Sequence, residues 1–576
     1  MALLSPRSSL FAAWFTRFVP LVLVLAIAIV YARSLHAPFL FDDADAVQRN
    51  PTIRRLDSWA ILNPPADGST TTGRPVVNLS FALNYAISGE AVWSYHALNL
   101  ALHTFAALAL LGLLRRTLIT LDPSAATYPT ALAGLVALLW ALHPLQTETV
   151  ICIAQRTESL CSLFYLLTLY AFSRACVEPN HHSRRWLVIC VAACLLGMAT
   201  KEVMVSAPLI VLLYDRTFIA RSFVAAWRRR QGFYVALTAT WILLVYLVLQ
   251  NSGSRGTAAG FGLGVTPWTY LLKQVEALVL YLRLSIWPHP LVLDYGTALP
   301  SSPVEVVWQG LVVLALLGGT IWALARRPVL GFAGAWFFLI LAPSSSFIPL
   351  ITQTVAEHRM YLPLAAVIAG LGLGVVRRFG PQALWFLAAI ISLFAGATIA
   401  RVSDYRDAIT MWSATTQHVP AQARVWTHLG AAYLAANRPL EALASLDRAL
   451  ALNPVDHAAR RNRALALLAL GRADEAAVIF ETLPAREPGE AVEYFALGNA
   501  FARDGKFPEA VAAYTRTVTL DPAHVAARAN LGNALLVSGR AREAIVAYEA
   551  ALRLNPADRG LLENLAIARE MAAARR

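Results

Sequence analysis

Long apolar runs alternate with short polar turns from residue 13 to residue 402, and the pattern changes beyond that point. A helix that crosses a bilayer needs about 20 predominantly apolar residues. The runs therefore predict an all-α, polytopic membrane domain over residues 1–402. Eleven spans are predicted, at residues 13–33, 94–114, 127–143, 149–173, 185–200, 202–219, 232–250, 303–325, 329–350, 360–376 and 382–402.

A further segment, residues 268–287, is apolar but carries Lys273, Glu276 and Arg283. Arginine and lysine favour the cytoplasmic side of a membrane. The arginine pairs between the spans can all be cytoplasmic only if this segment does not cross, so we interpret it as interfacial or re-entrant. The N-terminus is then cytoplasmic. The first loop (residues 34–93) and everything after residue 402 are extracytoplasmic.

The chain beyond residue 402 repeats with a period of 34 residues. Asn-Pro, Glu-Pro, Asp-Pro and Asn-Pro pairs end successive units, and the prolines Pro454, Pro488, Pro522 and Pro556 are evenly spaced. This period is typical of tetratricopeptide (TPR) helix pairs, which stack into a solenoid. We predict a linker helix at 403–422, four repeats over 423–556 and a capping helix at 557–576. The approximate repeat bounds are 423–456, 457–490, 491–524 and 525–558.

Small residues recur on the first helix of these units at Gly430, Gly498 and Gly532, with Ala464 in the second unit. Leu446, Phe480, Tyr514 and Tyr548 recur on the second helix. The pattern predicts that the two helices of each pair approach closely at the small residue.

Composition agrees with a membrane protein, because 57% of the 576 residues are hydrophobic. The net charge of +13 arises mostly from arginines that flank apolar runs. A topological role explains them, so nucleic-acid binding is not predicted. The five cysteines show neither metal-site spacing nor a disulfide framework.

Candidate chemistry begins with FLFDDADAV at residues 39–47, directly after the first span. A carboxylate at a membrane surface can accept a proton from a hydroxyl or bind a cation, and two adjacent ones allow one to react and one to orient. Asp42 and Asp43 are therefore candidate catalytic groups. A solvated loop beside a helix end is the alternative.

Other polar residues fall on the same predicted face. Charged side chains near hydrocarbon usually mark a pathway or a reaction site. Arg74, Lys201, His358 and Arg359 are suited to a phosphate at the depth of the lipid headgroups. His143, Glu148, Arg156, Glu202 and Glu357 are candidate polar residues of a cavity, although an internal Glu–Arg pair that stabilises helix packing explains part of this set equally well.

A base and phosphate-binding cations in one cavity fit glycosyl transfer from a polyprenyl-phosphate sugar. Two other functions compete with it. A non-enzymatic membrane anchor could hold the repeats for envelope assembly, and a flippase for lipid-linked sugars would use the same cations. The flippase interpretation is the weaker rival, because it calls for polar residues on both halves of the spans. No metal site and no definite cofactor are predicted, and a divalent cation beside the aspartates remains an option.

The chain resembles the transmembrane-and-TPR protein O-mannosyltransferases (TMTC), within the GT-C glycosyltransferases. The matching stretches are FLFDDADAVQRNP, GRPVVNLSFALNY, ALLWALHPLQTETVICIAQRTESL, ATKEV, EHRMYLP and the repeats. The resemblance implies transfer of a sugar, mannose in such relatives, from a polyprenyl-phosphate donor to a Ser or Thr hydroxyl of a protein, which the repeat surface could help to hold.

Carried onto this chain, the acidic motif of the family corresponds to Asp42 and Asp43, one of which should be the catalytic carboxylate. The family's aromatic-Arg-Pro element is represented by Gly73-Arg74-Pro75, so only Arg74 transfers. Lys201, Glu202, His358 and Arg359 match positions that face the donor cavity. Three lysines among 48 basic residues indicate a bacterial protein, so we expect the bacterial inner membrane with a periplasmic repeat domain.

Overall fold

The structure is a computed structural model, and it describes residues 6–121, 127–177, 180–251, 265–346, 349–350, 353–483 and 490–574. The chain divides into unit 1, Met1–His418, and unit 2, Val419–Arg576. Both units are built from helices in their described parts, as the all-α prediction requires. Each unit is described separately below.

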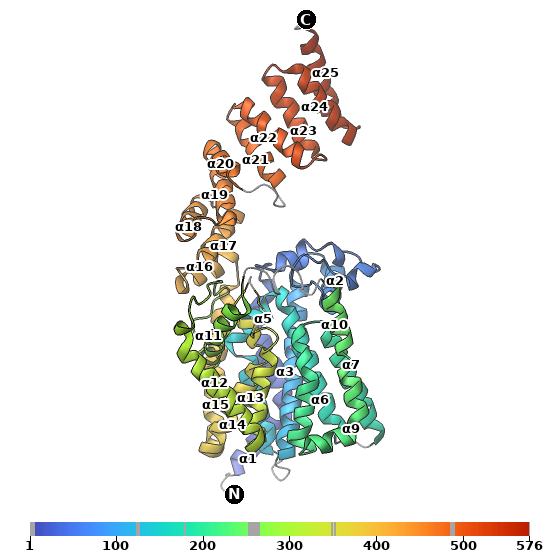
Figure 1. Cartoon of the computed structure of the whole chain (residues 1–576), viewed down its shortest axis with the longest axis vertical. Coiled ribbons are helices and arrows are strands. Elements are labelled where there is room, and N and C mark those ends of the chain that lie inside the picture. The colour runs from blue at the N-terminus through green and yellow to red at the C-terminus, as the bar shows by residue number, and fades with distance from the viewer. Residues whose placement is uncertain are drawn as a thin grey trace. The chain divides into compact units, whose positions relative to one another are not determined.

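Unit 1 is a bundle of long helices that stand side by side (Figure 1). Its long helices are α1 (Pro6–Tyr31), α3 (Trp93–Leu121), α4 (Thr127–Ala141), α6 (Arg156–Ala175), α7 (Asn180–Met198), α11 (Pro267–Ile286), α12 (Val307–Arg326), α13 (Pro328–Leu341), α14 (Leu364–Phe379) and α15 (Ala383–Asp404). Shorter helices are α2 (Pro75–Ser88), α5 (Thr147–Ile151), α8 (Ala207–Tyr214), α9 (Phe223–Thr238), α10 (Trp241–Gln250) and α16 (Ala408–His418).

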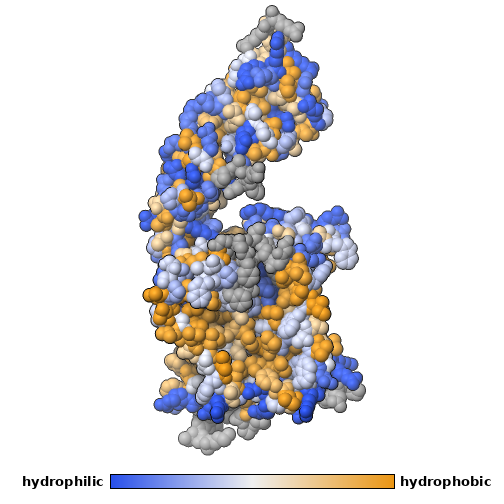
Figure 2. Space-filling model, in the orientation of Figure 1, coloured by the Kyte–Doolittle hydropathy of each residue, from blue (hydrophilic) through white to orange (hydrophobic). Residues whose placement is uncertain are grey.

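On the face shown in Figure 2, hydrophobic side chains form a band across the middle of unit 1, and hydrophilic side chains gather at its two ends. Within the described residues, five helices are long and apolar enough to cross a membrane, and a bent helix pair makes a possible sixth. Unit 1 is therefore a multi-pass membrane unit. The count of eleven spans and the interfacial placement of residues 268–287, which form the continuous helix α11, stay predictions.

The predicted spans 127–143 and 149–173 are interrupted in the structure. His143 is extended, and its imidazole accepts the N–H of Leu145, so α4 ends and a 3-10 turn begins at Pro144. After α5 the backbone is extended again at Cys152, and α6 starts only at Arg156. The chain between α4 and α6 therefore forms a folded corner, and α4 and the segment that follows it are bent by 56°.

The first loop packs on this corner. Short helical turns at Ala32–His36, Ala44–Gln48, Pro51–Ile53 and Trp59–Leu62 lead into α2. The buried amide of Asn78 on α2 donates to the carbonyl of Ile61 and to the hydroxyl of Thr52, and it accepts from the amide of Asn50. These bonds fold the polar loop into a compact cap on unit 1.

Unit 2 is a series of antiparallel helix pairs (Figure 1). The helices are α17 (Ala423–Ala435), α18 (Pro439–Leu452), α19 (His457–Ala469), α20 (Ala473–Glu481), α21 (Glu490–Arg503), α22 (Phe507–Leu520), α23 (Val525–Val537), α24 (Ala541–Leu554) and α25 (Arg559–Ala574). The predicted repeat boundary at Glu487-Pro488 lies outside the described residues.

The predicted close approaches of paired helices are confirmed. A Cβ atom added at Gly430 would lie 2.5 Å from the Leu446 side chain. At Gly498 it would lie 2.6 Å from the ring of Tyr514, and at Gly532 it would lie 2.5 Å from the ring of Tyr548. Only a residue without a side chain lets these helices pack at such distances.

We expect Gly498→Ala to weaken the α21–α22 pair by about 1–3 kcal/mol, because the new methyl group overpacks the contact with Tyr514. Amide hydrogen exchange of the full chain should show faster exchange in both helices. Gly560→Ala on α25 is the matched control, since its Cβ would only touch Asp558 at 3.5 Å. Equal exchange in the two variants would contradict the packing argument.

Candidate polar site at the first loop

The carboxylate of Asp43 ties the first loop to the corner between α5 and α6. Its Oδ2 accepts the N–H of Leu40 at 2.9 Å, and its Oδ1 accepts the N–H of Ala154 at 2.7 Å. The side chain is buried, with 1% of its surface exposed. Burial raises the pKa of Asp43 to about 7, against the opposing effect of the backbone N–H bonds. Asp43 is thus committed to holding the loop.

Asp42 differs from its neighbour because it is only partly buried. The residue before it, Phe41, has φ of 51°, in the left-handed region that costs a non-glycine residue energy. The ring of Phe41 packs edge-on against Trp412 at 5.7 Å, and Asp43 is fixed on the other side. These two contacts hold Asp42 in a strained turn, which is a common feature of functional sites. Asp42 is the better candidate for a reacting carboxylate.

Three of the predicted polar residues, Lys201, His358 and Glu148, join Glu158 in a chain of polar contacts. Lys201 pairs with Glu158. The imidazole of His358 lies 4.0 Å from the same glutamate through Nε2, and its Nδ1 lies 2.7 Å from Oε1 of Glu148. The backbone N–H of His358 donates to Oε2 of Glu148 at 2.9 Å. Burial lowers the pKa of His358 well below its ordinary value, and the charge of Lys201 acts in the same direction.

The other predicted phosphate-binding residues also have protein partners. Arg74 lies 3.4 Å from Glu202 and donates to the carbonyl of Thr70 at 2.7 Å, whereas its Nε has no hydrogen-bond partner among the described residues. Arg359 donates to the carbonyl oxygens of Gln353 and Thr354. Arg74 therefore keeps one donor for a ligand, and Arg359 mainly holds the backbone before α14.

Arg156 contacts neutral groups, and not the glutamate that the alternative interpretation of an internal Glu–Arg pair supposes. The guanidinium is completely buried and donates to the side-chain oxygens of Asn84 at 2.6 Å and Asn99 at 2.7 Å and to the carbonyl of Tyr95 at 2.8 Å. It also stacks 4.6 Å from the ring of Phe81. Neutral amides satisfy this cation, so it joins α2, α3 and α6.

His143 is a second residue with a local structural contact. It is completely buried, its Nε2 lies 3.2 Å from the carbonyl of Ser285 at the end of α11, and its ring packs against Phe394. The imidazole therefore connects the α4 corner to α11 and α15.

Glu357 holds a carboxyl oxygen without a partner. Its Oε1 accepts the N–H of Val292 at 2.6 Å and the hydroxyl of Tyr295 at 2.9 Å, whereas Oε2 has no hydrogen-bond partner among the described residues. Burial raises the pKa of Glu357 to about 8, and the positive charge of Arg401 opposes the rise.

Arg401 was not predicted as a site residue. It ends α15 at the face where the topology prediction places the periplasm, which runs against the usual preference of arginine for the cytoplasmic side. This exception is the sequence signal that could have identified Arg401 as a site residue. Its Nη1 donates to Oδ2 of Asp404 at 3.1 Å, and the side chain is mostly buried.

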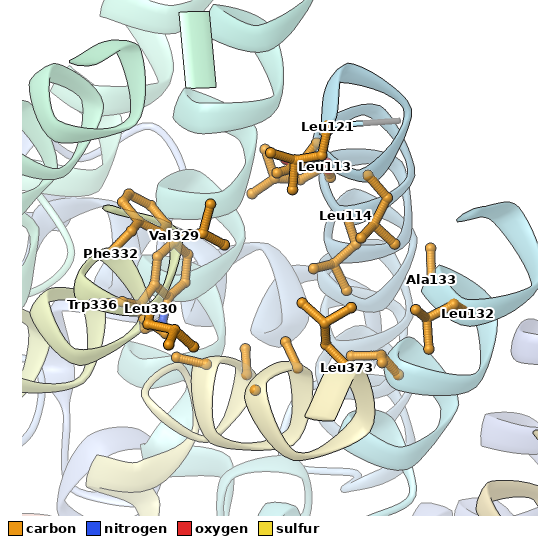
Figure 3. A pocket seen from close by; sticks show the side chains of 18 of the residues that line it. Leu113, Leu114, Leu121, Leu132, Ala133, Val329, Leu330, Phe332, Trp336 and Leu373 are labelled. Atoms are coloured by element: carbon orange, nitrogen blue, oxygen red, sulfur yellow. Dashed lines mark hydrogen bonds between the residues drawn. The ribbon is translucent and has the colours of Figure 1, made fainter. Parts of the chain in front are cut away.

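Within the described ranges, no group of three or more His, Cys, Asp or Glu side chains is arranged to hold a metal ion. A separate apolar pocket lies at the far end of α3 from the first loop. Leu113 and Leu121 line it from α3, and Phe332 and Trp336 face them from α13 (Figure 3). Its lining is mostly hydrocarbon and aromatic, with Thr117, Tyr214 and Arg377 as its polar members.

Sequence comparison relates the chain to known proteins. The chain is 29% identical over 325 residues to the protein O-mannosyl-transferase Tmtc2 of Drosophila melanogaster, which covers 53% of this chain and 33% of the relative. It is 35% identical over 166 residues to the protein O-mannosyl-transferase TMTC2 of Mus musculus, which covers 27% of this chain and 19% of the relative. The chain thus spans a third or less of the length of these relatives. The predicted resemblance to the TMTC proteins is confirmed.

The tetratricopeptide repeat prediction is also confirmed, because two tetratricopeptide repeat families match residues 400–444 and 495–570, and residues 433–498. Among solved structures, ArnT from Cupriavidus metallidurans bound to undecaprenyl phosphate aligns over 83% of this chain and 82% of its own, at 15% identity and a TM-score of 0.40. A TM-score of 0.40 makes the two folds only distantly comparable.

We expect Asp43→Asn to destabilise unit 1 by about 1–3 kcal/mol, because an amide offers one acceptor oxygen and leaves one buried N–H of Leu40 or Ala154 unpaired. Thermal unfolding of the purified full chain in lipid nanodiscs measures the loss. Asp45→Asn is the control, since that exposed side chain only pairs with Arg49 at the surface and such pairs contribute little. A melting temperature of Asp43→Asn equal to that of the control would show that Asp43 does not anchor the loop.

Proposed function

We propose, from the premise that this chain is a relative of the TMTC protein O-mannosyl-transferases, that it is a membrane glycosyltransferase. The proposed reaction moves a sugar, with mannose as the expected one, from a polyprenyl-phosphate donor to a Ser or Thr hydroxyl of a protein. The observation that carries the proposal is the strained turn that presents Asp42 beside the anchored Asp43.

In the proposed reaction, the acceptor hydroxyl oxygen attacks the anomeric carbon of the donor sugar. Its proton passes to the carboxylate of Asp42, and the bond between that carbon and the phosphate oxygen breaks. The lipid phosphate leaves with the electron pair of the broken bond. Asp42 therefore acts as general base, and Asp43 acts as a positioning residue.

Negative charge grows on the departing phosphate, so fixed cations near it lower the barrier. Arg74 is the best suited of the predicted phosphate-binding residues, because its Nε has no hydrogen-bond partner within the described part of the chain and its contact with Glu202 is long at 3.4 Å. Lys201 and His358 are held by Glu158 and Glu148, which fits a role in shaping the electrostatic field of the site. Arg359 contributes to the site by holding the backbone that precedes α14.

The repeats of unit 2 supply the proposed acceptor-binding surface. TPR arrays present an extended concave face to polypeptides. We place the reaction at the outer face of a bacterial inner membrane, with unit 2 in the periplasm, following the arginine distribution of unit 1 and the scarcity of lysine.

Asp42→Asn should lower transfer by about 10²–10⁴-fold, because the amide cannot accept the hydroxyl proton. The measurement is mass spectrometry of envelope glycoproteins from a deletion strain that carries either the wild-type chain or the variant. We expect a hexose mass to be present with the wild-type chain and absent with the variant, at equal protein level and equal melting temperature.

Asp45→Asn serves again as the control and should restore the hexose. Two results would overturn the proposal. In one, deletion of the whole chain leaves the glycoproteins unchanged, as a scaffold predicts. In the other, the Asp42→Asn strain retains the full hexose signal, which a flippase would allow.

A further inference from the structure

The apolar pocket at the far end of α3 from the first loop has a volume of about 180 Å³ (Figure 3). Its deep wall is formed by Leu110 of α3, Val136 of α4 and Trp336 of α13, which are 2%, 3% and 4% exposed. Its mouth is formed by Leu330 of α13, which keeps 56% of its surface exposed, and by the exposed Gly370 of α14. The pocket therefore passes from the apolar surface of unit 1 into the helix bundle.

Two glycines of α14 keep the mouth open. Gly370 and Gly374 both line the pocket and lie about one helical turn apart. A Cβ atom added at either position would meet no atom within 4 Å, and both residues have an ordinary helical backbone. Close packing therefore does not require glycine at these positions, whereas an open mouth does.

The polar groups inside the pocket are already hydrogen-bonded to the protein. The hydroxyl of Tyr214 donates to Thr117 at 2.8 Å, and Thr117 donates to the carbonyl of Leu113 at 2.8 Å. A buried water needs two to four polar partners, so a cavity with this lining stays dry. An empty apolar space also forfeits dispersion contacts for the atoms that line it. The pocket therefore favours a hydrocarbon occupant, which the bilayer at its mouth supplies.

The depth of the pocket indicates which leaflet the occupant comes from. Its lining residues on α14 extend from the buried Ala365 to the exposed Arg377 in the last turn. This separation corresponds to about 18 Å at a rise of about 1.5 Å per residue. One leaflet of a hydrocarbon core about 30 Å thick offers roughly 15 Å. The pocket therefore serves the leaflet at this end of unit 1, with Arg377 at the depth of the headgroups.

Positive charge gathers at the mouth of the pocket without nearby acidic residues in the same segments. Arg377 lines the pocket itself, and Arg326 and Arg327 join α12 to α13, whose first turn lines it. No Asp or Glu occurs within residues 306–356 or 358–403. Guanidinium groups bind phosphate oxygens well, and a headgroup with net negative charge is attracted more strongly than a zwitterionic one. The charge at the mouth therefore selects an anionic headgroup.

We propose that this pocket binds an anionic phospholipid of the adjacent leaflet, which the topology prediction makes the cytoplasmic one. One acyl chain lies between α3 and α13 (Figure 3), and the headgroup phosphate lies against Arg327 and Arg377. The lipid joins α3 and α4 to α13 and α14. This site is separate from the candidate polar site at the first loop and does not depend on the proposed function.

Native mass spectrometry of the delipidated full chain measures binding, with phosphatidylglycerol and phosphatidylcholine of identical acyl chains as probes. We expect the double variant Arg327→Gln with Arg377→Gln to weaken binding of phosphatidylglycerol by about tenfold or more, because each arginine near an anionic headgroup contributes about fivefold. Binding of phosphatidylcholine should change much less. The control, Arg228→Gln with Arg229→Gln, removes the same charge from exposed positions of α9 and should bind both lipids as the wild-type chain does. Equal losses in the two double variants would overturn the proposal.

A second pair of variants tests the pocket itself. Gly370→Phe places a ring where the structure has open space, so it should fold and should weaken binding of both lipids by about tenfold. Gly319→Phe makes the same change on α12, outside the pocket, at an exposed position that is equally open. It is also matched in depth, since each glycine lies seven residues before an arginine at the end of its helix, Arg326 or Arg377. Equal binding by the two variants would contradict the proposed site.

Photolabelling locates the acyl chain and separates this site from lipid that surrounds the whole bundle. A phosphatidylglycerol with a diazirine at the end of one acyl chain should label the deep wall at Leu110, Val136 or Trp336 in the wild-type chain, and Gly370→Phe should abolish that label. A label confined to other helices would overturn the proposal. Displacement of phosphatidylglycerol by an equal concentration of undecaprenyl phosphate would also overturn it, since the occupant would then be a polyprenyl lipid.

Discussion

Charged groups that are removed from water must be paired inside the protein, and this constraint organises one end of unit 1. Lys201 and Glu148 are joined through Glu158 and His358, so segments far apart in the chain meet at one place. Arg156 solves the same problem with neutral amides from α2 and α3. Apolar packing along a lipid-exposed bundle allows neighbouring helices several relative positions, whereas these directional contacts fix one. The polar network therefore positions the first loop, the α5 corner and the start of α14.

Some buried polar atoms at this end of unit 1 lack a hydrogen-bond partner among the described residues. Among the described residues, Nε of Arg74, Nε and Nη2 of Arg401 and Oε2 of Glu357 are buried without a hydrogen-bond partner. These atoms are where a bound ligand or an ordered water would supply the missing hydrogen bonds.

Asp42 and Asp43 have different roles in the proposed site. A buried carboxylate that accepts backbone N–H bonds is a good anchor and a poor proton acceptor for a substrate, because its oxygens are already occupied. The anchor in turn maintains the left-handed backbone at Phe41, whose cost is offset by packing on Trp412. Asp42 is thereby oriented before any substrate arrives, and preorganisation of this kind reduces the cost of reaching the transition state.

The repeat period determined the helix pairs of unit 2, because a small residue at each 34-residue interval, Gly430, Ala464, Gly498 or Gly532, lets the first helix pack closely against a large side chain of the second. Apolar run lengths likewise determined that unit 1 is a helical membrane unit, and the acidic motif and the EHR stretch identified residues that do meet. The interruption at His143 and Cys152, the amide partners of Arg156 and the division between Asp42 and Asp43 were decided by the tertiary structure. Each depends on which backbone N–H or side chain lies opposite in space, and residue type and local spacing do not contain that information. Arg401 shows the limit most clearly: the sequence indicates only that an arginine lies on an unusual side of the predicted membrane, and the tertiary structure shows which of its nitrogens have a hydrogen-bond partner among the described residues.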